Sequence, residues 1–409
     1  MMTRKPELLC PAGDQERLAA ALYFGADAVY LGGEAFGMRA APQNFTFEAL
    51  CLAVKQAHAQ GAKVYLTCNT LPRNRELAAL PAFLEKAADC GVDAFIVADF
   101  GVLAYCKKYA EKVPVHISTQ AGIVNYAAAR QFYELGAQRI VTARELSMDD
   151  IAEIRAKTPR DLEIECFVHG AMCVSFSGRC LLSNYLLGRD ANRGACAQPC
   201  RWEYALMEKK RDGLYFPIEE DKNGTYILNS KDMCMIEHIP ELVQAGVDSF
   251  KIEGRAKSAY YTAVITNAYR AAIDGYLKNP LPDYTPAPWV AEETKKVSYR
   301  EYCTGFYFGD PTEDANVSYA GGYVRTWDVA GVVTDADSEY LTVSQRNKFC
   351  VGDTLELLER GKAPVQFTVT EMQNADGEPI EAAPHPMMSL RIRSTLCPEA
   401  GALLRKQAQ

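Results

Sequence analysis

The sequence predicts an α/β protein: a closed (β/α)8 barrel of the TIM type with a cysteine-rich insertion after its seventh strand, followed by a small antiparallel β-barrel domain. Three observations lead to this prediction. Short apolar runs alternate with helical patterns over the first two-thirds of the chain, the alternation is interrupted once, and short alternating runs replace it near the C-terminal end. At 409 residues the chain exceeds one average domain, which also favours two domains.

Eight apolar runs have the composition of parallel strands that are covered on both faces. They are Glu7–Cys10, Ala28–Leu31, Lys63–Thr67, Ala94–Ala98, Val115–Ser118, Arg139–Thr142, Leu162–Val168 and Ser249–Glu253. Eight regular repeats favour a closed barrel, for which roughly 250 residues is the usual size. An open doubly wound sheet remains the alternative.

Amphipathic stretches between these runs predict the helices of the repeating unit. The clearest are Glu16–Phe24, Phe47–Ala59, Glu76–Asp89, Tyr126–Leu135 and Met148–Lys157. A glycine stands between helix and strand in several units, namely at Gly25, Gly61, Gly91, Gly136 and Gly246. Glycine closes a helix in left-handed geometry without the steric cost of a Cβ atom, so the recurring glycine marks the loop between each helix and the next strand.

One interval breaks this rhythm, because the seventh run centres near residue 165 and the eighth near residue 252. Most loops in such units have only about 2–6 residues outside their helix. We therefore predict a barrel domain over 1–280 with a large insertion at about 170–235. Such an insertion leaves the barrel at its C-terminal face, where the active sites of this fold lie.

The C-terminal part of the chain has a different pattern. Asn279–Trp289 is rich in proline, and 281–326 is predicted to be a linker and connecting segment. The predicted strands of the small β-barrel domain, which spans 327–409, are Val329–Thr334, Tyr340–Ser344, Thr354–Leu358, Gln366–Thr370 and Met387–Ile392. No catalytic-looking cluster occurs there, so we expect this domain to serve interaction or substrate presentation.

The composition limits which cellular compartment and which binding partners we expect for the protein. No run approaches the roughly 18 apolar residues of a membrane span, and no apolar core of a signal peptide follows the first residues, so we expect a cytoplasmic protein without membrane contact. A net charge of −8 argues against binding nucleic acid through overall positive charge. An RNA contact would need a local patch, such as Lys209, Lys210 and Arg211.

The chain has 14 cysteines. In a reducing compartment, we expect cysteines to be buried or metal-bound rather than paired in disulfides. Ten are scattered and are expected to behave mostly as small buried hydrophobic residues. They are Cys10, Cys51, Cys68, Cys90, Cys106, Cys166, Cys234, Cys303, Cys350 and Cys397.

The other four cysteines, Cys173, Cys180, Cys196 and Cys200, cluster within the predicted insertion. Four thiolates can hold a tetrahedral zinc ion or a four-iron cluster. Structural zinc usually uses close pairs, and only Cys196 and Cys200 form one; the CxxxCxxC motif of radical-SAM enzymes is absent. The spacing therefore favours a fully ligated [4Fe–4S] cluster, with zinc as the alternative. Four unliganded thiols are a third interpretation, which packing explains poorly.

A barrel sends the polar residues at its strand ends to the active face. On this rule we predict Lys251, Glu253 and His169 as catalytic residues, and Arg39, Asn69, Gln120 and Arg255 as substrate-binding residues; Asp99 and Arg144 also follow strands. Lys251 and Glu253 alternate with Ile252 and share one face of the strand. If that face is the barrel interior, the two form either a satisfied ion pair or a substrate handle.

Several motifs resemble those of the collagenase-like peptidase family U32. The signature-like stretches are Glu165–Cys173 (ECFVHGAMC) and Gly178–Ser183 (GRCLLS), and the similarity extends to Glu7–Gly13, Gly25–Gly32, Asn69–Thr70, Lys251–Arg255 and the terminal β domain. It covers nearly the whole chain. The family name implies proteolysis, yet better-understood members are hydroxylation proteins. The chain is most similar to the branch that converts the wobble uridine of tRNA to 5-hydroxyuridine.

The resemblance implies tRNA as a partner, an iron–sulfur cluster on the four clustered cysteines, and prephenate as the hydroxyl source of an oxygen-independent reaction. Some relatives work as pairs, so it also implies a related subunit as a partner. Prephenate has two carboxylates, and arginine is the side chain best shaped to bind a carboxylate, which makes Arg39 and Arg255 candidates.

The alternative function is a U32-type peptidase with a structural metal. Peptide hydrolysis needs an activated nucleophile or a metal-bound water. Neither a GxSxG nor an HExxH motif occurs. A cysteine that holds a cluster is not free to attack a peptide bond, so the residue chemistry disfavours this reading of the family name.

Overall fold

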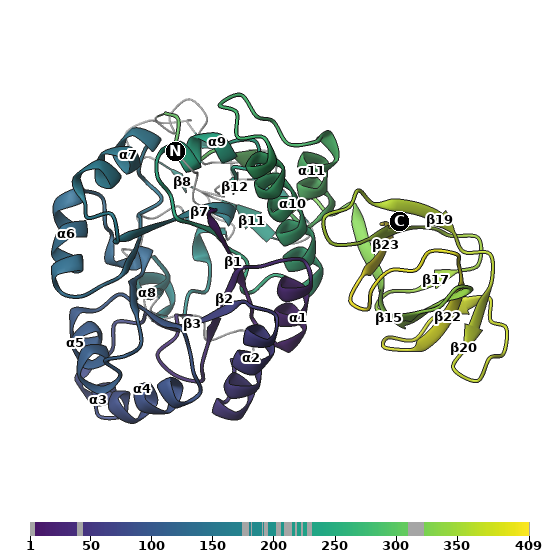
Figure 1. Cartoon of the computed structure of the whole chain (residues 1–409), viewed down its shortest axis with the longest axis horizontal. Coiled ribbons are helices and arrows are strands. Elements are labelled where there is room, and N and C mark those ends of the chain that lie inside the picture. Colours follow the sequence, from purple (N-terminus) through teal and green to yellow (C-terminus); the bar gives the residue numbers. More distant parts are fainter. Residues whose placement is uncertain are drawn as a thin grey trace.

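A computed structural model describes residues 5–38, 44–173, 180, 182–189, 191, 195–201, 206–207, 215–216, 219–221, 224–226, 231–309 and 323–408. Its larger part is the predicted barrel (Figure 1). The barrel strands are β1 (Glu7–Pro11), β2 (Ala28–Gly32), β3 (Lys63–Cys68), β4 (Ala94–Val97), β5 (Val115–Ile117), β6 (Arg139–Val141), β7 (Glu163–Ala171) and β13 (Ser249–Ile252). Neighbouring strands pair in parallel, and β13 pairs with both β7 and β1. The barrel is therefore closed, as predicted.

Helices surround the barrel on its outside (Figure 1). They are α1 (Gln15–Tyr23), α2 (Phe47–Ala59), α3 (Asn74–Leu77), α4 (Leu80–Asp89), α5 (Phe100–Tyr109), α6 (Tyr126–Glu134), α7 (Met148–Lys157), α9 (Ile239–Gln244) and α10 (Ala259–Lys278). The predicted helix Glu76–Asp89 is divided into α3 and α4, because Pro81 occupies the first turn of a new helix. All five glycines that precede strands have positive φ, as the helix-closing role requires; Gly25, for example, has a φ of 95°.

The insertion returns to the barrel through one short strand, and a second short strand joins it from the segment after α10; the sequence pattern predicted neither. Strand β12 (Asp232–Cys234) pairs antiparallel with the end of β7, and β14 (Tyr302–Cys303) pairs in parallel with β12. Arg300 fixes this return, since its Nη2 donates to Oδ1 of the buried Asp232 at 2.7 Å. Strands of two or three residues carry too little alternation to be recognised in a sequence.

Described elements within the insertion are short. They are α8 (Leu182–Leu187), the 3-10 turn Pro199–Arg201, β8 (Leu206–Met207), β9 (Tyr215–Phe216), β10 (Glu219–Asp221) and β11 (Gly224–Tyr226). Strand β8 pairs with β9, and β10 pairs with β11, both antiparallel. The predicted basic patch at Lys209, Lys210 and Arg211 lies outside the described residues.

The C-terminal domain is an antiparallel sheet that curls into a half-barrel around its own apolar core (Figure 1). Its order is β19-β18-β23-β15-β16-β22-β20, from β15 (Trp327–Ala336), β16 (Tyr340–Gln345), β18 (Thr354–Leu358), β19 (Val365–Thr368), β20 (Met372–Asn374), β22 (Ser389–Arg393) and β23 (Leu403–Gln407). A further pair joins β17 (Phe349–Cys350) to β21 (Ala382–Ala383). Five of these strands match predicted runs; β17, β20, β21 and β23 were not predicted.

The segment expected as a linker packs against both domains. It contains α11 (Pro288–Glu293), and its Val290, Val297 and Tyr307 belong to the barrel core. Glu293 is buried and accepts from Nη1 of Arg405 in β23 at 2.7 Å, while Nη2 of Arg405 donates to Glu356 in β18 at 2.8 Å. A buried ionic cluster therefore joins the two domains.

The scattered cysteines follow the prediction only in part. Cys51 in α2 and Cys90 at the end of α4 form a disulfide, which the expectation of a reducing compartment did not include. Cys10, Cys68, Cys106, Cys166 and Cys303 are buried as predicted, whereas Cys397 is exposed. No described helix combines the length and apolar character needed to cross a bilayer.

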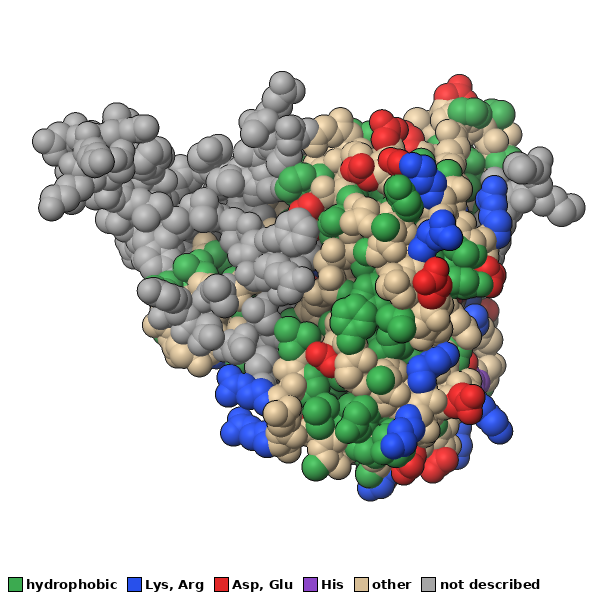
Figure 2. Space-filling model, turned by 90° about the vertical axis from the view of Figure 1, so that its left-hand side faces the viewer, with side chains coloured by type: hydrophobic (Ala, Val, Ile, Leu, Met, Phe, Trp, Pro, Cys, Tyr) green, Lys and Arg blue, Asp and Glu red, His purple; other side chains and the backbone are tan. Residues whose placement is uncertain are grey.

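The side of the barrel that is formed by α5, α6 and α7 shows hydrophobic side chains among charges of both signs (Figure 2). Phe100, Tyr126 and Leu135 are among its exposed apolar residues. On the visible described surface of this side, Lys and Arg are interspersed with Asp and Glu and form no basic stripe of the kind that binds a nucleic-acid backbone.

Candidate active site

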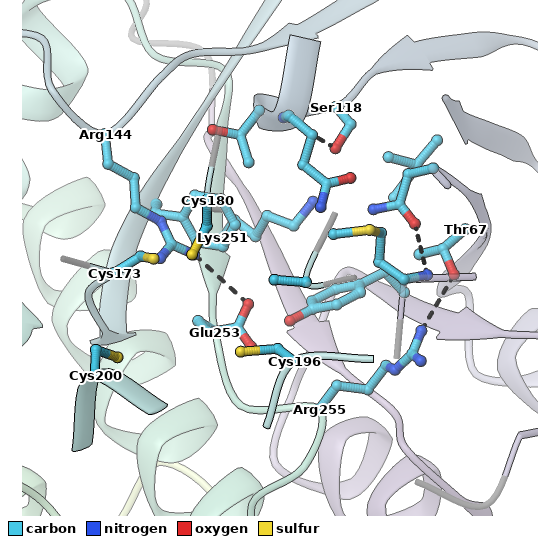
Figure 3. Close-up of a pocket in the computed structure, with 18 of the residues that line it drawn as sticks. Thr67, Ser118, Arg144, Cys173, Cys180, Cys196, Cys200, Lys251, Glu253 and Arg255 are labelled. Atoms are coloured by element: carbon cyan, nitrogen blue, oxygen red, sulfur yellow. Dashed lines mark hydrogen bonds and ion pairs between the residues drawn. The ribbon is translucent and has the colours of Figure 1, made fainter. Parts of the chain in front are cut away.

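A cavity of about 200 Å³ lies at the C-terminal ends of the barrel strands (Figure 3). Nine of the eleven predicted site residues line it: Asn69, Gln120, Lys251, Glu253, Arg255, Cys173, Cys180, Cys196 and Cys200. They come from four strands or strand ends and from the insertion, and only the closed barrel brings them together. Of the other two, Arg39 lies outside the described residues, and His169 is placed elsewhere.

Lys251 lies at the bottom of the cavity. Its Nζ donates to Oε1 of Glu165 at 2.7 Å and stands 4.7 Å from the ring centroid of Tyr30. Lys251 and Glu165 are both buried. The ion pair therefore forms with a residue of β7, and not with Glu253 two positions along the same strand.

Below Lys251 the barrel interior is filled by an ionic layer around Arg139. Its guanidinium donates to Glu165 at 2.9 Å and to Glu7 and Glu163 at 2.6 Å each. Burial raises the pKa of the Glu7 carboxyl, but the charge of Arg139 and the hydrogen bonds from Arg139, Tyr65 and Ser249 together outweigh burial and hold that pKa below its usual value. Because Arg139 is only 2% exposed, this layer closes the barrel beneath the cavity.

Glu253 is the one carboxylate among the described residues that line the cavity. Oε2 of Glu253 lies 3.6 Å from Nη2 of Arg144, and Figure 3 shows the two side chains facing each other. Arg144 is also held by the carbonyl of Ala171 at 2.9 Å and lies 3.9 Å from the ring centroid of Phe167. Glu253 thus has a fixed cation beside it.

Arg255 reaches the cavity from the loop after β13. Nη1 of Arg255 donates to Oγ1 of Thr67 at 3.2 Å, and its Nη2 donates to Oδ1 of Asn44 at 3.3 Å. Gly32 makes room for it, since a Cβ atom at residue 32 would lie only 2.5 Å from Nη1. Asn69 stands nearby, where its Oδ1 accepts from the backbone of Met38 at 3.2 Å.

Gln120 has an unused hydrogen-bonding group in the cavity. It lies in a short 3-10 turn after β5, and its buried Oε1 accepts from no described residue. A buried polar atom without a partner costs free energy, on the order of 1–3 kcal/mol. The side chain is therefore suited to accept a hydrogen bond from a ligand.

The four clustered cysteines reach the cavity from the insertion (Figure 3). Cys173 is exposed, and Cys180, Cys196 and Cys200 are half-buried. In residue type and location they fit a four-thiolate site. In the described part of the chain, however, no three His, Cys, Asp or Glu side chains stand close enough together to share a metal ion. Cluster binding would therefore have to draw the thiols together.

His169, predicted as catalytic, does not line the cavity. Lys251 pairs with Phe167 but Ile252 pairs with His169, so β7 has one extra residue at this point. Such a bulge reverses the face on which the next side chain lies. His169 consequently packs among tyrosines, 5.5 Å from the ring centroid of Tyr269 and 5.3 Å from that of Tyr302. This position gives no support to a catalytic role.

Burial lowers the pKa of His169 to about 3. The unfolded chain binds a proton at this residue below its ordinary pKa of about 6.5, whereas the folded chain stays neutral down to about pH 3. The free energy of unfolding should therefore fall with decreasing pH across this window, by up to about 1.4 kcal/mol per pH unit from this residue. Urea denaturation at pH 7 and pH 5 measures the effect.

The control is His169→Phe, which keeps a ring and cannot titrate. It should lose less stability than the wild type between pH 7 and pH 5. An equal loss in both proteins would show that His169 is protonated in the folded state.

Three residues of the site were not assigned roles from the sequence. Arg144 was recognised at a strand end, but its contact with Glu253 depends on a distant part of the chain. Glu165 was quoted only as part of a motif, and Thr67 was not singled out. The available signal was the position of Glu165 itself, a charged residue between the apolar Ile164 and Cys166 of β7.

Known proteins and protein families are similar to this chain over most of its length. The family model for peptidase family U32 matches residues 13–316, and the model for the U32 C-terminal domain matches 325–405. The chain is 37% identical over 396 residues to tRNA hydroxylation protein P1 of Bacillus subtilis, covering 96% of this chain and 93% of that protein. It is 36% identical to tRNA hydroxylation protein P of Escherichia coli, covering 93% and 92%. It is 44% identical to an uncharacterized protease of Methanocaldococcus jannaschii, covering 90% of each.

Proposed function

Because the chain belongs to peptidase family U32, we propose that it is a tRNA-modifying enzyme that hydroxylates the wobble uridine to 5-hydroxyuridine, without oxygen and with prephenate as co-substrate. The relatives from Bacillus subtilis and Escherichia coli are named for tRNA hydroxylation. The observation that carries the proposal is one cavity lined by four cysteines, three cationic side chains and a carboxylate.

The cationic side chains are suited to a small carboxylate ligand. Lys251, Arg144 and Arg255 all line the cavity, and Glu253 is the one carboxylate among its described lining residues. The planar guanidinium of arginine binds carboxylates through paired hydrogen bonds. Prephenate, with two carboxylates, matches this charge balance, and we assign its binding to Arg255 and Arg144.

The uridine would enter from the mouth of the same cavity. The wobble base belongs to a single-stranded loop, so it can be turned out of its stack at lower cost than a base in a duplex. Tyr30 and Phe167 supply aromatic surface in the cavity, and Oε1 of Gln120 can accept a hydrogen bond from the imide N–H of the base. These contacts would present C5 of the uracil to the co-substrate.

Replacing the C5 hydrogen by a hydroxyl group oxidises the base. Atoms and electrons balance when the co-substrate gives up its hydroxyl group to the base and receives hydrogen in exchange. We assign the removal of the C5 proton to Glu253, because it is the carboxylate at the cavity and Arg144 holds it in place. Lys251, fixed by Glu165, is placed to stabilise negative charge that develops on the base.

We further propose that Cys173, Cys180, Cys196 and Cys200 hold a [4Fe–4S] cluster, with zinc as the alternative metal. Their common location at the cavity supports the assignment. When bound through all four thiolates, a cluster would supply electron transfer beside the reacting groups. The proposed setting is the cytoplasm, with a related subunit of the same family as a further partner.

The test uses protein purified without oxygen, tRNA that lacks the modification, and prephenate. Mass spectrometry of the digested nucleosides should detect 5-hydroxyuridine, and omission of prephenate should abolish it. Iron and sulfide analysis is made on the same sample. Cleavage of collagen-derived peptides without any 5-hydroxyuridine would overturn the proposal in favour of a peptidase.

A further inference from the structure

A second and larger cavity lies between the barrel and the C-terminal domain. Its volume is about 620 Å³, within the range of about 300–1,000 Å³ that is usual for ligand sites. Helix α1, the loop that leads into α10, and strand β15 all contribute to its wall. Within the described part of the chain, it shares no lining residue with the cavity that contains the cysteines. We call it the interdomain cleft.

The wall of the interdomain cleft is largely apolar and partly aromatic. Tyr23 of α1 and Trp327 of β15 contribute one aromatic ring from each domain. Ala19 and Ala20 on α1 have small side chains that leave the space open. Trp327 is held in place by cations, since Nζ of Lys296 lies 4.7 Å from its ring centroid. Flat apolar walls of this kind suit a planar aromatic ligand.

Among the charged residues that the structure describes around the cleft, one cation has no acidic partner. Arg346 is paired with Glu16 at 3.0 Å, and Nε of Arg325 is bonded to Asp328 at 3.0 Å. Lys257 forms no ion pair with a carboxylate of the described chain. Its Nζ donates instead to the carbonyl of Ser298 at 3.1 Å.

Lys257 is also partly removed from water. Its Nζ stands 4.0 Å from the ring centroid of Tyr323, and burial lowers its pKa below the ordinary value. A desolvated cation gains free energy from an anionic partner. An aromatic ligand that carries a negative charge could therefore pack against the apolar walls of the cleft and pair with the ammonium group of Lys257.

One loop connects the cleft to the proposed active site. Between β13 and α10, Glu253 and Arg255 line the first cavity, and the next residues, Ala256 and Lys257, line the cleft. Tyr261 ties the loop to α10, because its hydroxyl donates to the carbonyl of Glu253 at 2.9 Å. The two cavities thus adjoin along one short stretch of backbone at the active face.

We propose that the interdomain cleft binds a nucleotide, with the base against Trp327 and Tyr23 and the phosphate near Lys257. The identity of the molecule that carries this nucleotide rests on the proposed function. The nucleotide belongs to the tRNA substrate and neighbours the uridine in the first cavity. Free mononucleotides share this chemistry, and the experiment separates the two sources. The C-terminal domain then forms one wall of an RNA-binding site.

The test compares the full-length wild type with Ala19→Phe, which fills the cleft. Ala19 is exposed on α1, so the substitution should leave the fold intact, as thermal unfolding will show. The matched control is Ala156→Phe, at an exposed position of α7 away from the cleft. The probes are an anticodon stem-loop RNA and uridine 5′-monophosphate, with affinities measured by calorimetry.

We expect Ala19→Phe to weaken RNA binding about tenfold, the usual scale for loss of one stacked base, and Ala156→Phe to leave it unchanged. A second variant, Lys257→Gln, should reduce the slope of log affinity against log salt by about one, as loss of a phosphate contact does. If Ala19→Phe binds uridine 5′-monophosphate more weakly than the wild type but binds RNA equally well, the cleft is a nucleotide site that serves free nucleotides.

If neither probe distinguishes Ala19→Phe from the wild type, the cleft is not a nucleotide site. That result would leave the proposed function standing whenever the wild type still forms 5-hydroxyuridine. Conversely, RNA binding that depends on the cleft, without hydroxylation by the wild type, would overturn the proposed function and keep the cleft.

Discussion

Replacing Arg405 by methionine is expected to lower the free energy of unfolding by about 3–5 kcal/mol. Arg405 is fully buried and binds the carboxylates of Glu293 and Glu356, with Nη2 of Arg405 lying 2.6 Å and 2.8 Å from them. Methionine fills similar space but leaves two buried carboxylates to share the charge of Lys296, whose Nζ lies 3.2 Å from Glu293 and 3.0 Å from Glu356, so that one negative charge is no longer balanced. Uncompensated buried charge is among the largest single costs in a folded protein.

Urea denaturation, followed by circular dichroism, measures this loss. The matched control is Arg391→Met, which removes an exposed pair with Asp337 on the same domain and should cost less than about 1 kcal/mol. The combined variant Arg405→Met with Glu293→Met should recover part of the loss, since it also removes one of the stranded carboxylates. A similar cost for Arg405→Met and Arg391→Met would mean that the buried cluster contributes no more than a surface pair.

The second large effect is expected for Cys196→Ala. Under the proposed function it removes one of four cluster ligands, so the iron content should fall from about four per chain toward zero. The formation of 5-hydroxyuridine should fall to background in the same protein. Iron and sulfide analysis and nucleoside mass spectrometry on protein made without oxygen provide both readings.

Cys397→Ala is the control, because Cys397 is an exposed cysteine of the C-terminal domain, away from the cavity. It should retain both iron and activity. If Cys196→Ala keeps its iron, Cys196 is not a ligand. If it loses iron but still modifies tRNA, the cluster has a structural role. One zinc per wild-type chain, even after anaerobic reconstitution with iron and sulfide, would overturn the cluster assignment.

The barrel and its active face could be predicted because their signals are local and repeated. Glycines such as Gly25 and Gly136 recur where a helix must turn into a strand, and their positive φ confirms this role. Once the barrel is assumed, strand-end residues such as Lys251 and Asn69 must converge, and they do. Convergence follows from topology alone and needs no knowledge of side-chain contacts.

The structure differs from the expectation where a contact depends on distant parts of the chain. His169 would face the cavity if β7 were regular, but one extra residue turns it outward, and nothing in the sequence marks that bulge. Lys251 binds Glu165 rather than its strand neighbour Glu253 because the two residues lie on adjacent strands. The disulfide of Cys51 and Cys90 likewise depends on where two helices meet.

The ionic layer around Arg139 has a kinetic consequence. Because it seals the barrel beneath the proposed active site, a ligand cannot enter the cavity from below, along the barrel axis. A small co-substrate must pass through the mouth that a bulky RNA would later cover. The reaction should therefore follow a compulsory order, in which the small molecule enters first and its remnant departs only after the RNA has left.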